Sequence, residues 1–425
     1  MKRNVGNIVF IALVVLTVAV WIIFPPINDG RENFLRTYVG EVLGSIVIVL
    51  MSFSLFLSAR PKWAEPYFGG LDKMYQTHRR TSTSAFLLLF VKLMVVPITT
   101  VNLRLGNYLA IISFLGIIAI VLPTLAPRIP ILNKLSGPTY ESWKKLHRYI
   151  GIFFILGYIH ALTINALSAF IAINWVQIFF IIGVVSYLYT EVFGRFLRKY
   201  VPYTVEAVNH PNKSVAEVVL RPKKDPIPKH RAGQFLFVRF LGDNTLNESH
   251  PFTISSAPNE NVLRLTIKAC GDFTRHLFAN LKAGMDAVIE GAYGMFDYKT
   301  GGQKQIWIAG GIGVTPFLSF IRDLEAGLDR DVDFYYTVRH REEAVFVDEI
   351  EAAGTRHPRL KTRVRFSSVD GSLSVDEIIA NAGGSLHGYD IYMCGPLPMV
   401  QAFEQKFLEA GIPAANIHFE EFNFR

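Results

Sequence analysis

Cysteine is scarce in this chain of 425 residues, which contains only Cys270 and Cys394. Because the two lie far apart, the sequence offers neither a disulfide framework nor a paired-cysteine metal motif. The half of the chain that carries both is therefore expected to lie in the cytoplasm. Internal repeats and low-complexity segments are also missing, which excludes a repeat architecture.

Charged residues are few as well, at 18% of the chain, whereas hydrophobic residues make up 51%. A formal net charge of +8 is compatible with nucleic acid, but much of the basic excess lies in loops beside apolar segments. We therefore expect no nucleic-acid partner. The length suggests two or three folding units.

Apolar residues are concentrated in the first half, in runs that reach the roughly 20 residues needed to span a lipid bilayer. Residues 1–20 have the basic start and apolar body of a signal peptide, but the run continues to Phe24 without a small-residue cleavage site. We interpret it as a retained helix and predict an all-α six-helix membrane bundle over residues 1–200. The six runs begin near Asn7, Glu41, Ser82, Gly106, Ile150 and Trp175.

The loops between these runs alternate in charge. Residues 1–3, 60–80, 128–148 and 195–199 are basic, while the intervening loops carry only Arg31, Arg36 and Arg104. Basic loops stay on the cytoplasmic side of a membrane. The pattern predicts a multi-pass protein of the cell membrane with both termini in the cytoplasm.

Three histidines fall within or beside the apolar runs, where polar groups are costly and mark function. His78 and His147 lie at the cytoplasmic ends of the third and fifth runs, so they also suit an anchoring role at the membrane surface. His160 lies deeper in the fifth run. Two histidines at one depth on different helices can supply both axial ligands of a low-spin haem.

The second half has the composition of a soluble protein. Residues 203–290 alternate short β-rich runs with proline, glycine and asparagine turns, which predicts an antiparallel β-barrel over residues 201–302. From Gln305 onward, apolar strands, glycine turns and amphipathic helices alternate. That pattern predicts a doubly wound α/β nucleotide-binding domain over residues 303–425.

A glycine-rich turn follows the first strand of the expected α/β domain. It contains Gly310, Gly311 and Gly313, and it leads through Thr315 and Pro316 into a helix. Glycines at this place let a dinucleotide approach the backbone, in the crevice at the carboxyl ends of the strands. Thr315 is a candidate contact for the nicotinamide end.

The segments His78-Arg-Arg and His147-Arg-Tyr-Ile-Gly, with His160, resemble the ferric reductase and NADPH oxidase superfamily. In that family two helices each carry two histidines, which clamp two stacked b haems. The inner pair maps onto His78 and His147. The outer pair would be His160 and the residue fourteen positions after His78, but that residue is Lys92.

This departure leaves several roles open for Lys92. A neutral amine can ligate iron if burial depresses its pKa. The side chain can also extend toward the outer membrane surface, or pair with a carboxylate of a lipid or cofactor. The resemblance therefore implies one inner haem b, and leaves a second haem in question.

The segment His250-Pro-Phe-Thr-Ile-Ser-Ser-Ala-Pro closely resembles the flavin-binding strand of ferredoxin-reductase-like proteins, in the form that NADPH oxidases use. An ordinary strand that ends in a serine turn is the alternative. The segment that begins at Lys268 fits the family's second flavin motif, with a helix start that directs N–H groups at pyrophosphate. Together the two motifs imply FAD contacts from Phe235, His250, Pro251, Phe252, Thr253, Ser255, Ser256, Lys268, Gly271, Asp272, Phe273 and Thr274.

Three further features fit the same family. Arg339 and Arg341 stand where it often binds the adenosine ribose, and guanidinium groups suit a 2′-phosphate, so NADPH is favoured over NADH, although both residues also suit a solvated loop. The resemblance places Cys394, with Gly395 and Pro396, beside the nicotinamide ring. It gives Phe424 the role of an aromatic cover over the flavin, although Arg425 extends the chain past it. Cys394 and Phe424 are thus the residues predicted to lie at the hydride-transfer site.

The sequence therefore predicts an oxidoreductase that passes electrons from cytoplasmic NADPH through FAD and haem b into the membrane. Oxygen, a ferric chelate, or a periplasmic or membrane redox partner are the acceptors that the resemblance implies, and the fold does not choose among them. The alternative is a membrane-anchored NAD(P)H diaphorase, or a partner module for another reductase, with an incomplete haem pathway.

Overall fold

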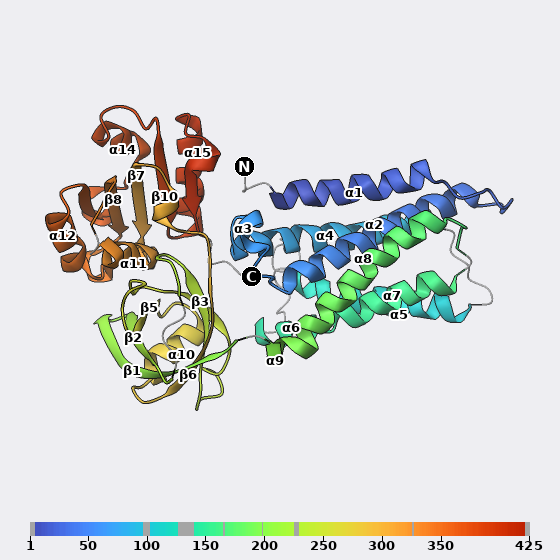
Figure 1. Ribbon diagram of the computed structural model, residues 1–425, viewed down its shortest axis with the longest axis horizontal. Helices are drawn as coiled ribbons and strands as arrows, with labels where there is room; N and C mark the ends of the chain where they lie inside the picture. The colour runs from blue at the N-terminus through green and yellow to red at the C-terminus, as the bar shows by residue number, and fades with distance from the viewer. Residues whose placement is uncertain are drawn as a thin grey trace. The chain divides into compact units, whose positions relative to one another are not determined.

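The structure, a computed structural model, describes residues 5–96, 103–125, 140–164, 166–197, 199–224, 229–324 and 327–420. The chain divides into two compact units, Met1–Leu197 and Arg198–Arg425. Figure 1 shows that the first is helical and that the second contains two β-sheets with helices around them. Phe424, predicted to cover the flavin, lies outside the described residues.

Helices make up nearly all of the first unit. Short α3 precedes α4, and α6 is separated from α7 by a two-residue turn, while α8 continues into one turn of π-helix at Tyr189–Phe193. The helices are α1 (Val5–Ile23), α2 (Phe34–Ser58), α3 (Glu65–Phe68), α4 (Leu71–Val95), α5 (Leu105–Leu125), α6 (Tyr140–His147), α7 (Ile150–Thr163), α8 (Phe170–Leu188) and α9 (Gly194–Leu197).

Five stretches of the first unit are long and apolar enough to cross a membrane. They are Val5–Ile23, Phe34–Ser58, Leu105–Leu125, Ser142–Thr163 and Phe170–Phe193. The sixth expected span corresponds to α4, which has 25 residues but is too polar to be counted with them. It begins at Leu71, well before the predicted start near Ser82, because charged residues that suggested a loop are helical. A six-helix membrane bundle therefore stays a prediction.

Small residues let the helices of this unit approach closely. A Cβ atom added to Gly116 of α5 would lie 2.1 Å from the ring of Phe153 on α7. One added to Gly183 of α8 would lie 2.9 Å from the hydroxyl of Ser52 on α2. Such contacts are the usual basis of helix association in lipid, where burial from water supplies no driving force.

The first sheet of the second unit is antiparallel and has the strand order β4-β3-β6-β1-β2-β5. A bridge between Ile254 and Leu265 brings its two edges together, in agreement with the predicted barrel. Helix α10 (Asp272–Asn280) follows β5. The strands are β1 (Val201–Asn212), β2 (Val215–Pro222), β3 (Phe235–Phe240), β4 (His250–Thr253), β5 (Leu263–Lys268) and β6 (Asp286–Tyr293).

The second sheet is parallel and has the order β11-β10-β7-β8-β9. Its strands are β7 (Lys304–Gly310), β8 (Asp331–Val338), β9 (Leu360–Phe366), β10 (Tyr389–Cys394) and β11 (Ile417–Phe419). Side chains from α11 (Thr315–Asp323) and α12 (Val347–Arg356) fill one hydrophobic cluster, while those from α14 (Val375–Asn381) and α15 (Leu397–Glu409) fill another. The order reverses at β7, so the carboxyl ends of β7 and β10 border the crevice where such sheets bind ligands.

Candidate functional site

Two glycine turns meet at the carboxyl edge of the parallel sheet. A Cβ atom added to Gly313, after β7, would lie 2.2 Å from the carbonyl oxygen of Cys394 at the end of β10. One added to Gly395 would lie 3.0 Å from Cα of Gly310. The predicted dinucleotide turn and the predicted cysteine-glycine motif are therefore in direct backbone contact.

Gly311 is a partly exposed member of the first turn. Its φ is +57°, which L side chains rarely adopt, and a Cβ atom added there would meet no atom within 4 Å. The space beside it is therefore open to a ligand. Helix α11 begins directly after the turn, with Pro316 in its first turn, and its unpaired N–H groups suit the phosphates of a dinucleotide.

The side chains of Thr315 and Cys394 are both buried at this edge. The hydroxyl of Thr315 donates to the carbonyl of Ile312 at 2.7 Å, so it already serves the turn itself. Burial raises the pKa of the Cys394 thiol well above its ordinary value, and the nearby Glu420 carboxylate adds to the shift. Cys394 is therefore a neutral thiol and not a nucleophile, consistent with a role in close packing.

Arg339 and Arg341 follow β8 at the same edge and are exposed. The guanidinium of Arg341 lies 5.9 Å from the ring centre of Phe366. The backbone carbonyl of Arg339 accepts from Ser368, which fixes the main chain of the loop. Both guanidinium groups are accessible to a phosphate, as the prediction of an NADPH contact requires.

The predicted flavin strand is β4, at one edge of the antiparallel sheet. The ring of His250 stacks on Phe273 of α10, with ring centres 3.6 Å apart and an interplanar angle of 25°. Phe252 lies 6.3 Å from the same ring. These three half-buried aromatic groups provide a flat apolar surface that suits an aromatic cofactor.

Not every predicted flavin contact has an accessible side chain. Phe235, Ser255 and Ser256 are fully buried. The hydroxyl of Ser255 accepts from Thr266 at 3.0 Å, and that of Ser256 accepts from the N–H of Arg264 at 3.1 Å. Since the two hydroxyls are used within the protein, a role for them in holding FAD stays a prediction that this arrangement does not favour.

The loop before α10 is shaped by Thr274. Its hydroxyl accepts from the N–H of Gly271 at 2.9 Å and of Cys270 at 3.0 Å. This closes the loop and directs the first turn of the helix, with the exposed Asp272, outward. Thr274 thus shapes a helix start whose N–H groups suit pyrophosphate, and its predicted role at the FAD site stays a prediction.

In the helical unit, His78 of α4 and His147 at the end of α6 come together. Their ring centres are 6.4 Å apart and their planes are inclined by 75°. Iron bound at about 2 Å from a nitrogen of each ring would separate the ring centres by about 6 Å. The separation of the two rings therefore fits a metal held between them.

The hydrogen bonds of His78 involve Nδ1 and leave Nε2 available to bind such a metal. Its Nδ1 lies 2.8 Å from the hydroxyl oxygen and 2.9 Å from the carbonyl oxygen of Ser54, and because the carbonyl can only accept, the tautomer with the proton on Nδ1 satisfies both contacts and leaves the lone pair on Nε2. His147 differs, because its buried Nδ1 has no hydrogen-bond partner among the described residues. Its ring lies 4.9 Å from that of Trp143.

His160 lies on α7, and like His78 it makes contact with a backbone carbonyl oxygen through Nδ1. Its Nδ1 lies 2.8 Å from the carbonyl oxygen of Gly106 on α5, which leaves the lone pair on Nε2. Lys92 is near enough to interact with it electrostatically. The two residues that the resemblance assigns to the outer haem position are therefore within electrostatic range of each other.

Lys92 has a partner that the sequence did not reveal. Its ammonium group approaches α2, where a Cβ atom added to Gly44 would lie 2.9 Å from Nζ, and it interacts electrostatically with Glu41. Glu41 also accepts from the N–H of Leu167 at 2.8 Å. The proximity of Glu41 gives Lys92 an electrostatic contact within the protein that does not depend on iron. The sequence feature that could have revealed this contact is Glu41, a single acidic residue beside an apolar run, which was interpreted only as the start of a membrane span.

Comparison with known proteins bears on the second unit. Residues 200–301 match a family of FAD-binding domains, and residues 307–405 match the oxidoreductase NAD-binding domain family. The second unit is an NAD(P)H-dependent oxidoreductase module of the ferredoxin-reductase type. The predicted order of an FAD domain followed by a nucleotide domain is confirmed.

Among similar proteins, a flavohemoprotein of Xylella fastidiosa is 27% identical over 223 residues, which are 50% of this chain and 56% of that protein. The carnitine monooxygenase reductase subunit of Escherichia coli is 28% identical over 203 residues, 46% of this chain and 60% of the other. The chain thus spans little more than half the length of these curated relatives. A crystal structure of flavohemoglobin from Malassezia yamatoensis, with bound FAD and haem, has a TM-score of 0.53 and 19% identity, covering 91% of this chain and 97% of that one. At this identity the likeness concerns the fold alone.

Proposed function

We propose that the chain transfers electrons from cytoplasmic NADPH, through FAD and a haem b, to an acceptor on the far side of the membrane. The observation that carries the proposal is the pair His78 and His147, on two different helices, at a separation that fits one iron. The five apolar helices support a location in the membrane. The resemblance of the same histidine segments to ferric reductases and NADPH oxidases supports it further.

The module in the second unit supplies the donor side of this pathway. Bound FAD would take up two electrons together and release them singly, which is the conversion needed between a nicotinamide and a haem. The residues around Gly311 and the helix start at α11 would bind the dinucleotide, and Arg339 and Arg341 favour NADPH over NADH. His250, Phe252 and the loop at Gly271 would hold the FAD.

We propose oxygen or a ferric chelate as the acceptor on the far side, in line with the superfamily that the helical unit resembles. Lys92 is within electrostatic range of His160, and in this proposal the two residues border the place where an acceptor would meet the end of the pathway. A cation next to the acceptor would stabilise the negative charge that superoxide carries, so the position of Lys92 suits oxygen.

One observation favours a second candidate function. Lys92 stands where the resemblance implies the fourth haem-ligating histidine, and it lies near Glu41, so the outer position lacks one of its two expected imidazoles. A chain with an incomplete haem pathway would act as a membrane-anchored NAD(P)H diaphorase, or as a reductase module for a separate haem protein.

The test is the ratio of haem to FAD in the purified full-length chain, read from the dithionite-reduced absorption spectrum. We expect one haem per FAD, and we expect His78→Ala to remove it while FAD content is unchanged. A haem-to-FAD ratio of zero would rule out electron transfer through haem across the membrane and would support the second candidate, a membrane-anchored NAD(P)H diaphorase. A ratio of two would show that the outer site binds haem despite Lys92.

The acceptor is tested by comparing superoxide production in air with ferric-chelate reduction under anaerobic conditions. Superoxide production that stops in the His78→Ala variant would support oxygen as the acceptor beyond the haem. Production that persists in this variant would come from the flavin directly, and would count against a haem pathway.

A further inference from the structure

Side chains on α11 are hydrogen-bonded to the segment that directly follows β4, within the predicted flavin motif. The hydroxyl of Ser319 donates to the carbonyl oxygen of Ser256 at 2.7 Å, and both side chains are fully buried. One turn later, Nη1 of Arg322 donates to the carbonyl oxygen of Ser255 at 2.9 Å. The same helix starts at the glycine turn that is predicted to bind the nicotinamide dinucleotide. A single short helix thus connects the two cofactor motifs.

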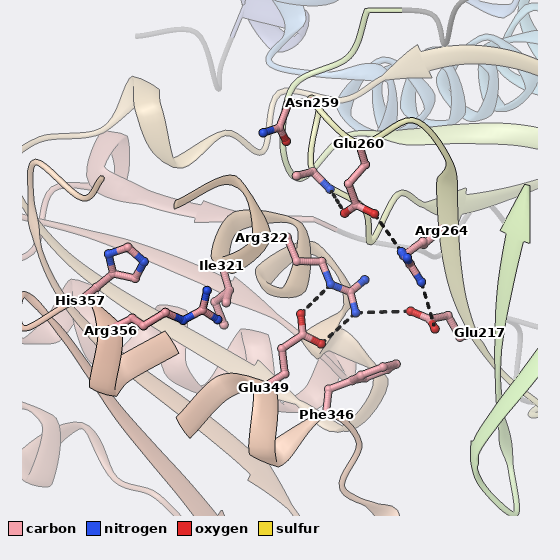
Figure 2. A pocket seen from close by; sticks show the side chains of 11 residues that line it. Glu217, Asn259, Glu260, Arg264, Ile321, Arg322, Phe346, Glu349, Arg356 and His357 are labelled. Carbon is pink, nitrogen blue, oxygen red and sulfur yellow. Dashed lines mark hydrogen bonds and ion pairs between the residues drawn. The ribbon is translucent and has the colours of Figure 1, made fainter. Parts of the chain in front are cut away.

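Arg322 makes the largest set of these contacts, and Figure 2 shows its guanidinium between carboxylates from both sheets' domains. Nε and Nη2 donate to the two oxygens of Glu349 on α12, at 2.7 and 2.9 Å. Nη2 also donates to Glu217 of β2, at 3.3 Å. The ring of Phe346 lies 5.2 Å from the guanidinium carbon. The side chain therefore holds α11, α12, β2 and the end of the flavin strand in one arrangement.

The charge on Arg322 is permanent under working conditions. Burial alone would lower the pKa of its guanidinium, but the carboxylates of Glu349 and Glu217 outweigh burial and raise that pKa. A planar guanidinium can make the two parallel bonds to Glu349 and still reach Ser255, whereas an ammonium group cannot. The planar, forked arrangement of N–H groups in the guanidinium, and not only its positive charge, is therefore needed to make all of these contacts.

A cavity of about 490 Å³ opens beside this cluster. Arg356 lines the same cavity from the end of α12 and is exposed, and no bond joins it to the FAD domain among the described residues. A shortened side chain at position 322 would therefore be replaced by water and would not leave a sealed void. Arg356 provides a matched control for the removal of one positive charge from this cavity.

We propose that Arg322 is a positioning residue for hydride transfer, which fixes the flavin strand relative to the helix that carries the dinucleotide turn. Hydride transfer moves two electrons and one proton together from the nicotinamide C4 to the flavin N5, and its rate depends steeply on the alignment of the two rings. Two hydrogen bonds set this alignment, one from Arg322 to the Ser255 carbonyl and one from Ser319 to the Ser256 carbonyl. Both join α11 to the segment that follows β4. The inference concerns the step before any haem, so it holds whichever acceptor follows.

The experiment measures flavin reduction by NADPH in the full-length protein, under anaerobic conditions in a stopped-flow spectrometer. In Arg322→Gln we expect the limiting rate at saturating NADPH to fall by about ten- to a hundredfold, the loss typical of a misaligned donor. The charge-transfer absorbance between nicotinamide and flavin should weaken, while the half-saturating NADPH concentration changes little. Arg322→Lys should remain slow, because it keeps the charge and loses the fork.

Three controls separate alignment from simple loss of structure. Arg356→Gln should reduce flavin at the native rate, and FAD content and the thermal unfolding midpoint are measured for every variant. Ser319→Ala removes one hydroxyl with little risk to folding and should slow the limiting rate several-fold. Hydrogen exchange of residues 253–256 should be faster in Arg322→Gln and unchanged in Arg356→Gln.

The proposal would be overturned by a native limiting rate in Arg322→Gln, or by full recovery in Arg322→Lys. It would also be overturned if Arg322→Gln and Ser319→Ala slowed flavin reduction only in proportion to FAD lost. Because flavin reduction is read directly, none of these results depends on whether electrons then reach a haem, and a missing haem would leave the inference intact.

Discussion

Glu41 and Lys92 show how two ionisable side chains can be accommodated among apolar helices. Each would be costly alone in a membrane, but Gly44 lets the lysine approach α2, where it comes within electrostatic range of Glu41. His160 lies near the same lysine. The outer half of the proposed pathway therefore holds an acid, a base and an imidazole.

Removal of one member of this group leaves the other without a partner. We expect Lys92→Gln to destabilise the helical unit, because Glu41 would lose the positively charged group near it. The measurement is the thermal unfolding of the detergent-solubilised protein. The double variant Lys92→Gln with Glu41→Gln should recover most of the loss, and a double variant no more stable than Lys92→Gln would contradict the pairing.

Arg339 and Arg341 carry the prediction of cofactor preference. We expect Arg339→Gln with Arg341→Gln to raise KM for NADPH about tenfold or more and to leave KM for NADH nearly unchanged, since each lost charge-assisted bond is worth about 1.5–3 kcal/mol. Steady-state rates with both dinucleotides provide the measurement. An equal change for NADH would show that the arginines do not bind the 2′-phosphate.

Residues in motifs could be predicted from the sequence, whereas residues that act through a distant contact could not. The glycines of the turn after β7 are recognisable because backbone approach to a dinucleotide demands them. Arg322 belongs to no such pattern, and its bond to Ser255 spans 67 positions of the chain. Glu41 was overlooked for the same reason, since its partner lies on another helix.

At the scale of elements, the contact between the turns after β7 and β10 decides which glycine tolerates a side chain. We expect Gly313→Ala to cost about 1–3 kcal/mol, as other overpacking substitutions do, because its Cβ atom would meet the Cys394 carbonyl. The unfolding midpoint and the FAD-linked activity with NADPH are measured together.

Gly311→Ala is the matched comparison for that substitution. Its Cβ atom would enter open space, so we expect only the cost of about 1–2 kcal/mol for a left-handed alanine. If the open space receives the dinucleotide, KM for NADPH should nevertheless rise. An unchanged KM would place the dinucleotide elsewhere.

The elements of the second unit could be predicted more closely than those of the first. Alternating hydrophobic patterns and glycine turns predicted a barrel followed by a parallel sheet, because the pattern of apolar residues along a strand indicates which of its faces are buried. The start of α4 was misplaced, since hydropathy alone does not distinguish a loop from a helix whose polar residues face neighbouring helices.

At the scale of the whole molecule, electrons are expected to flow in one direction, from NADPH on the cytoplasmic side to an acceptor on the far side of the membrane. We expect NADPH outside reconstituted liposomes to reduce a membrane-impermeant ferric chelate trapped inside, through molecules whose module faces outward. Each electron that crosses works against the potential it creates, at about 2.3 kcal/mol per charge for about 100 mV. A potassium ionophore should therefore accelerate the reaction.

Liposomes that contain the His78→Ala variant are the control for this measurement. They should oxidise NADPH with an artificial acceptor added outside, and leave the trapped chelate oxidised. Reduction of the trapped chelate by this variant would contradict electron transfer through the haem site.

The polar character of α4 also has a consequence for biogenesis. In the proposed arrangement α4 must reside in the membrane, yet it carries charges at both ends of its length and is less apolar than the five helices that qualify as spans. Such a segment does not partition into lipid by its own hydropathy. Because α4 packs against α2, we expect its insertion to depend on α2 already being in the membrane, so that a chain without α2 would leave α4 outside the bilayer.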